Sequence, residues 1–138
     1  MKSIPKWMQD LTINTLIEFK PGCDIPIITI RHRADKFSSG RCDASHIALT
    51  IGTSRKDAKL ILLHELAHWI LPRVKKFYGW GIWRKEFTNP QGHTPEFWDL
   101  AWTLYRWAKL PVSYCKSREY SYRAGAKQGY LRSRKKES

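Results

Sequence analysis

Two histidines and a glutamate lie close together in the stretch LLHELAHWI, residues 62–70. His64 and His68 are four residues apart, so on a helix their rings project from one face and can both reach one metal ion. Glu65 projects beside that pair, where its carboxylate can act as a general base toward a zinc-activated water without being a ligand. We interpret the pattern as a zinc site, because two histidines and a glutamate are costly in the packing of an otherwise apolar helix.

A catalytic zinc ion takes three protein ligands and keeps one position for water, so a third ligand must come from elsewhere in the chain. His93 directly precedes a predicted helix start, where a well-defined backbone would present it to the ion. Glu96 is one turn further along and could bind the metal or could instead hold the ring of His93. Glu86 lies in a predicted loop and has no such scaffold. We favour His93, and the residues themselves leave Glu96 open.

Short elements are predicted before the motif. Residues 7–19 place apolar side chains on one helical stripe, which a proline and a glycine then end. Residues 24–30 and residues 46–51 are short and rich in β-branched side chains, which predicts two strands of a small sheet. Residues 38–40 read as a turn between them.

Two further helices are predicted to carry the candidate ligands. The motif helix spans residues 54–71, because Ser54 and Asp57 have the spacing of a capping box and helix formers follow until a proline. The next helix spans residues 95–109, because Thr94 is a good N-cap and a proline follows at the first helical position. The predicted fold class is therefore α+β.

The length and composition indicate how many domains the chain can form and what kind of partner it can bind. A chain of 138 residues is enough for one compact domain, and 42% hydrophobic with 13% aromatic residues supplies ample material for a core. The formal charge of +13 and the pI near 9.9 make a polyanion the first partner to consider. Nucleic acid, an acidic protein and an anionic membrane surface all qualify, since charge alone does not choose among them.

The cysteines and the apolar runs bear on location. Cys23, Cys42 and Cys115 are odd in number, far apart and without the spacing of a metal knuckle, which suits a reducing compartment and favours buried thiols. We expect no signal peptide, because charged residues and a proline interrupt the N-terminal segment, and no apolar run elsewhere is long enough to span a membrane. The expectation is a cytoplasmic monomer that binds no membrane.

Two segments combine basic and aromatic residues. Residues 73–92 lack a clean period and are predicted to be a long loop, with a short hairpin at residues 79–81. Residues 116–138 hold eight basic and two acidic residues, a net charge of +6, and are predicted to be a C-terminal tail. Both could bind single-stranded nucleic acid, while a lid over the active site and a disordered solubilising end are the plainer alternatives. The candidate contacts to nucleic acid are Lys75, Lys76, Arg84, Lys85, Arg132, Arg134, Lys135 and Lys136.

Several of these stretches together resemble a known family. GRC at residues 40–42, HIALTI, LLHELAHW and GHTPEFW at residues 92–98 resemble the SprT-type zinc metallopeptidases, including Spartan-like proteins and small relatives of the YgjP type. The resemblance covers about residues 26–107. It implies a minimal zincin fold over residues 1–115, Zn²⁺ bound by His64, His68 and His93, Glu65 as the catalytic base, and hydrolysis of peptide bonds in a protein substrate.

The chain departs from that family in two respects. SprT proteins commonly carry a cysteine-based zinc ribbon after the protease domain, and this sequence has none. In YgjP-type relatives the third histidine follows the motif much sooner, whereas residues 73–92 intervene here.

An oxyanion-stabilising residue is usual in such sites, and the sequence does not choose among Tyr105, Tyr114, Tyr120 and Tyr122.

Three hypotheses of function follow. The first is a zinc metallopeptidase that works on proteins associated with DNA. The alternative is a non-catalytic zinc-containing protein that binds nucleic acid, although such a protein would have no need of Glu65. The third is a metallopeptidase whose positive charge recognises an acidic protein.

Overall fold

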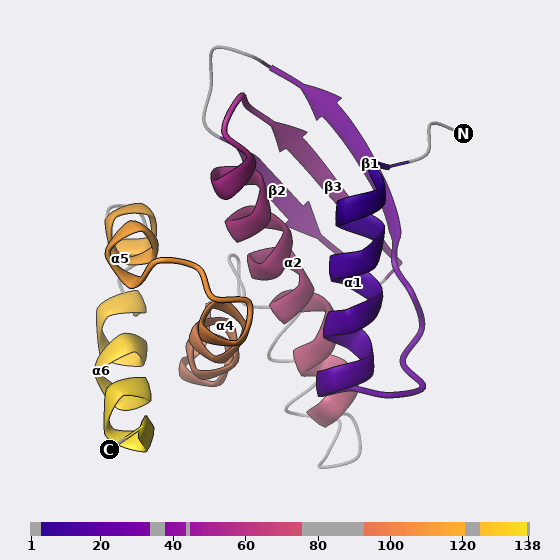
Figure 1. Cartoon of the computed structure of the whole chain (residues 1–138). Coiled ribbons are helices and arrows are strands. Elements are labelled where there is room, and N and C mark those ends of the chain that lie inside the picture. Colours follow the sequence, from indigo (N-terminus) through magenta and orange to yellow (C-terminus); the bar gives the residue numbers. More distant parts are fainter. Residues whose placement is uncertain (1–3, 34–37, 44, 76–92, 121–124, 138) are drawn as a thin grey trace.

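A computed structural model describes residues 4–33, 38–43, 45–75, 93–120 and 125–137. These residues form five helices and one three-stranded sheet (Figure 1), so the fold class is α+β, as predicted. The predicted order of an N-terminal helix, a small sheet, the motif helix and a following helix is confirmed. In chain order the elements are α1 (Lys6–Phe19), β1 (Ile27–His32), β2 (Ser39–Cys42), β3 (His46–Ile51), α2 (Arg55–Lys75), α4 (Pro95–Trp107), α5 (Val112–Tyr120) and α6 (Ala126–Glu137).

Helices cover the apolar face of the sheet. Its strand order is β1-β3-β2, with β1 parallel and β2 antiparallel to the central β3. Ile47 and Leu49 of β3 are buried, and Ile28 and Ile30 of β1 pack against the same core. This period of two is expected for a sheet with one covered face. Figure 1 shows α1 and α2 over that face.

Two predictions about the strands need correction. β1 begins at Ile27 rather than at residue 24, because the preceding Pro26 has no N–H to give to the strand ladder. The turn predicted for residues 38–40 is wrong, because Ser39–Cys42 forms β2 and pairs with β3. Gly40 therefore lies within a strand and not in a turn.

Helix α2 is the central element of the molecule. It contacts α1 and the sheet on one side and α4 on the other. Most of its side chains are buried, among them Leu62, Leu63, Leu66 and Ile70, each of which is 0% exposed. A helix that is apolar nearly all round is one that neighbours surround. Four polar residues of α2 are therefore buried, namely Asp57, His64, Glu65 and Arg73, while Arg55 and Lys56 in its first turn are exposed.

The predicted end of the motif helix at Leu71 is also wrong, since α2 continues through Pro72 to Lys75. A proline in a last turn removes one helical hydrogen bond, here the one to the carbonyl of His68, and leaves the earlier turns intact. The Arg73 side chain supports this last turn. It donates to the Trp69 carbonyl at 2.8 Å, and its guanidinium carbon lies 3.4 Å from the centre of the Trp69 ring.

Helices α5 and α6 replace the tail expected after Cys115. One face of α6 consists of Ala126, Gly129 and Ser133, which are all buried and let α6 approach α4 closely. The indole N–H of Trp102 in α4 donates to the carbonyl of Ala126 at 3.0 Å. The basic composition of this segment concealed a stripe of small residues with helical spacing.

The cysteines differ in burial. Cys115 is 1% exposed, and burial raises the pKa of its thiol to about 12, so it has the character of an inert core residue. Cys23 and Cys42 are half-buried, and none of the three cysteines forms a disulfide within the described residues. No helix in the described part of the chain is long and apolar enough to cross a membrane.

Candidate metal centre

Three histidines from two parts of the chain meet where α2 packs against α4. His64 and His68 project from α2, and His93 directly precedes the N-cap of α4. Each offers one ring nitrogen, and these ligand atoms lie within 4.8 Å of one another. The ring centroids of His64 are 5.1 Å from those of His68 and His93, and the last two are 5.0 Å apart. The rings form a nearly equilateral triangle.

The separation of one pair of these ligand atoms matches that in a tetrahedral metal site. Two nitrogens bound to one zinc ion at about 2.0–2.1 Å with tetrahedral angles lie roughly 3.3 Å apart. The Nε2 atoms of His64 and His93 are 3.1 Å apart. Imidazole nitrogens suit zinc and also copper, iron and nickel. The donor set therefore fits a metal ion without specifying zinc.

The start of α4 holds two of the three rings. Thr94 is the N-cap, as predicted, and its side chain accepts a hydrogen bond from the backbone N–H of Phe97 at 3.2 Å. Phe97 stacks on the ring of His68 with centroids 4.0 Å apart, and Trp98 stacks on the ring of His93 at 5.3 Å. Because Phe97 and Trp98 are themselves fully buried, they restrict the orientation of the histidine rings.

The candidate base Glu65 is 4% exposed and lies where α2 meets β2. A β-carbon built on Gly40 of β2 would lie 2.9 Å from Cγ of Glu65 and 2.9 Å from Cδ2 of Leu49. Only a residue without a side chain fits there, so the backbone of β2 passes directly over Glu65. Gly40 serves this close approach and not a turn.

Glu119 of α5 is a residue that the sequence reasoning missed. Its side chain is 3% exposed, and its Oε2 lies 2.8 Å from Nδ1 of His64. The hydroxyl of Tyr105 donates to the same oxygen at 2.6 Å. Burial and the charge of Glu119 raise the pKa of Tyr105 well above its usual range, so the hydroxyl keeps its proton. The one signal in the sequence was an isolated acid within a basic segment.

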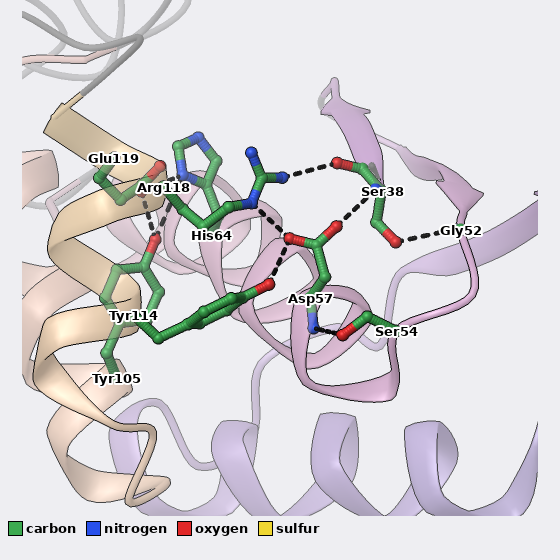
Figure 2. A network of polar contacts seen from close by, with 9 residues as sticks. All are labelled: Ser38, Gly52, Ser54, Asp57, His64, Tyr105, Tyr114, Arg118 and Glu119. Atoms are coloured by element: carbon green, nitrogen blue, oxygen red, sulfur yellow. Dashed lines mark hydrogen bonds and ion pairs between the residues drawn. The ribbon is translucent and has the colours of Figure 1, made fainter. Parts of the chain in front are cut away.

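A second buried network fixes α5 beside the first turn of α2 (Figure 2). Asp57 is 1% exposed, accepts from the Tyr114 hydroxyl at 2.7 Å and forms an ion pair with Arg118. Arg118 also donates to the carbonyl of Ser38 at 3.0 Å. The predicted capping contact is present, since Ser54 Oγ accepts from the backbone N–H of Asp57 at 3.1 Å. The carboxylate of Asp57 thus joins α2, α5 and the start of β2.

The other candidate site residues lie outside this cluster or outside the described residues. Glu96 is exposed and is not among the residues whose ligand atoms meet, and Glu86 lies outside the described part. Tyr105 and Tyr114 donate their hydroxyls to the buried carboxylates of Glu119 and Asp57. Tyr120 is the last residue of α5, and Tyr122 lies outside the described residues.

The candidate contacts to nucleic acid do not form one described surface. Lys75 is the last residue of α2, and Lys135 and Lys136 belong to α6. Arg132 pairs with Asp99 at 2.8 Å, and Arg134 is exposed. Lys76, Arg84 and Lys85 lie outside the described residues, as do most of the predicted loop and its hairpin.

No family model, curated protein or solved structure matches this chain.

Proposed function

We propose that this chain is a zinc-dependent metalloendopeptidase of the SprT-like type, with a minimal zincin fold. Its ligands would be His64, His68 and His93, and Glu65 would be the general base. The observation that carries the proposal is the meeting of three histidine ligand atoms within 4.8 Å, two of them on the helix that also bears the buried Glu65. Structural zinc sites almost always use four protein ligands, whereas a catalytic site uses three and keeps one position for water.

Each residue of the centre has a separate role in this mechanism. A zinc ion held there would supply a Lewis acid for the peptide carbonyl and make water acidic enough to react near neutral pH. Glu65 takes a proton from the attacking water and delivers it to the nitrogen of the leaving amine. Phe97 and Trp98 keep the rings of His68 and His93 in place.

The edge strand β2 offers a way to orient a peptide substrate. Among the described residues it pairs only with β3, so its outer edge presents backbone groups that an extended peptide can pair with. Because Gly40 brings β2 against Glu65, a peptide added to this edge would run past the base. Backbone pairing of this kind favours unfolded or extended protein segments as substrates.

Metal analysis and proteolysis test the proposal together. Glu65→Gln keeps the size of the side chain and removes the base, so we expect roughly one zinc ion per chain, as in the wild type, and a loss of at least about 100-fold in cleavage of an unfolded protein. Glu18→Gln on the exposed face of α1 is the matched control and should cleave normally. A fully active Glu65→Gln protein would exclude this mechanism.

The third ligand is tested by a second pair of variants. His93→Ala should lose the zinc ion, whereas Glu96→Ala should retain it, because Glu96 lies outside the group of meeting ligand atoms. If only the Glu96 change empties the site, the assignment of His93 is wrong.

The charge of +13 favours a second candidate, a non-catalytic zinc-containing protein that binds nucleic acid. It differs from the first in predicting binding to DNA and no cleavage of any unfolded protein with zinc present. A metallopeptidase that acts on DNA-associated proteins in the cytoplasm would instead bind DNA and also cleave an unfolded protein.

A further inference from the structure

His64 uses its second ring nitrogen inside the protein. Its Nε2 faces the other histidines, 3.1 Å from Nε2 of His93, while its Nδ1 points the opposite way and meets Oε2 of Glu119 at 2.8 Å. His64 and Glu119 are 2% and 3% exposed, so water does not compete for this contact. Figure 2 shows Glu119 and Tyr105 together on this side of the ring.

The contact decides which ring nitrogen of His64 is free to bind a metal. A metal-binding histidine is a neutral imidazole with one N–H, and an ionised carboxylate only accepts hydrogen bonds, so in the metal-bound form the nitrogen that faces Glu119 carries the hydrogen. Nδ1 is then the donor, and Nε2 keeps its lone pair toward the cluster. A carboxylate in this position fixes the tautomer and the orientation of the ring and makes the histidine a stronger ligand.

We propose that Glu119 is the positioning residue of the metal centre, acting through His64 and held in place by Tyr105. The inference rests on the metal site of the proposed function but not on its peptidase activity. It adds a partner contributed by α5, a helix that follows both halves of the ligand set in the chain.

Glu119 is itself held from two directions. The hydroxyl of Tyr105 in α4 donates to Oε2 at 2.6 Å and keeps the carboxylate at its place. The neighbouring residue Arg118 pairs with Asp57, which lies seven residues before His64 on α2. Two consecutive residues of α5 thus attach to α2 about two turns apart. This arrangement fixes the position along α2 at which Glu119 meets His64.

The experiment measures the Zn²⁺ affinity of the whole chain by competition with a chromophoric chelator. Glu119→Gln keeps the volume and loses the charge, and Glu119→Ala removes the acceptor. We expect affinity to fall about 10- to 100-fold in Glu119→Ala and by a smaller factor in Glu119→Gln. Substitution with Co²⁺ gives a second readout, because its absorption spectrum changes when a ligand ring reorients.

Two tyrosines provide a matched pair. Tyr105→Phe removes the hydroxyl that holds Glu119, and Tyr114→Phe removes a hydroxyl that holds Asp57 without touching His64. Each variant loses one hydrogen bond to a buried carboxylate, and Tyr105→Phe also removes a hydroxyl that lies 3.3 Å from Nδ1 of His64. Only Tyr105→Phe should weaken zinc binding, whereas a merely structural role of the two networks would lower thermal stability in both and leave zinc affinity unchanged.

The outcomes separate the inference from the proposed function. If Glu119→Gln binds Zn²⁺ within twofold of the wild type, and Tyr105→Phe binds it as tightly as Tyr114→Phe, Glu119 does not position the metal. Should Glu119→Ala fail to fold, the Gln and Tyr105→Phe variants decide. If the wild type binds zinc and the variants bind it more weakly as expected, but the wild type cleaves nothing, the inference is supported and the peptidase proposal is excluded. A wild type that binds no zinc overturns both.

Discussion

Gly40 lies so close to Glu65 that the backbone of one strand limits where the candidate base can go. A β-carbon at Gly40 would come within 2.9 Å of Glu65 Cγ, and also within 3.2 Å of Ile61 Cγ2. Real side chains essentially never approach so closely, so any larger residue at this position must displace Glu65 or the strand. The position of one glycine therefore bears directly on the chemistry of the centre.

Gly40→Ala should consequently reduce peptidase activity more than metal binding. We expect a loss of about 1–3 kcal/mol in the free energy of unfolding from overpacking, together with lower kcat/KM and an unchanged zinc content. Gly22→Ala is the control: its φ of 79° makes any side chain unfavourable, but nothing lies within 4 Å of the added carbon. Activity that falls equally in both variants would mean that Gly40 acts only through stability.

At the scale of elements, α6 supports the centre through α4. A β-carbon built on Gly129 would lie 2.5 Å from Cβ of Trp98 and 3.2 Å from the Trp102 ring. Trp98 in turn stacks on His93. The close packing of two helices is therefore continuous with the ring stacking that holds a candidate ligand.

Gly129→Ala tests this connection. Alanine normally favours a helix over glycine by about 1 kcal/mol, but here its methyl group would push α6 away from Trp98. We expect a net loss of about 1–3 kcal/mol in the urea-derived free energy of unfolding, accompanied by weaker Zn²⁺ binding. The exposed neighbour Gln128→Ala should be neutral or slightly stabilising. A stabilised Gly129→Ala protein would show that α6 has room to adjust.

At the scale of the whole molecule, the positive charge indicates a polyanionic partner. The described residues place Arg134 at the surface of α6, and they pair Arg132 with Asp99. A net charge of +13 creates a long-range field that attracts polyanions, which salt screens.

Binding to single-stranded DNA should therefore depend steeply on salt. If the protein contacts about six phosphates of a single strand, affinity should fall roughly 300-fold between 50 mM and 200 mM salt, measured by fluorescence anisotropy. Arg134→Ala should lower affinity and reduce the salt slope by about one if that arginine contacts phosphate. No binding to DNA at 50 mM salt, with tight binding to an acidic protein, would favour the third hypothesis.

The sequence by itself determined the features that depend on neighbouring residues. The four-residue spacing of His64 and His68 indicated one helix face, and Thr94 followed by a proline fixed the start of α4 beside His93. Helical periodicity and capping are short-range effects, so they can be read without knowing the packing. The α+β class followed from the same local patterns.

Only the tertiary structure decided what surrounds those residues. Glu119 reaches His64 from 55 positions along the chain, and Gly40 meets Glu65 across the boundary between β2 and α2. No local pattern marks such contacts, because they depend on how helices and strands pack after they form. The small residues of α6 were hidden by its charge for the same reason: their role is to fit α4, which lies elsewhere in the sequence.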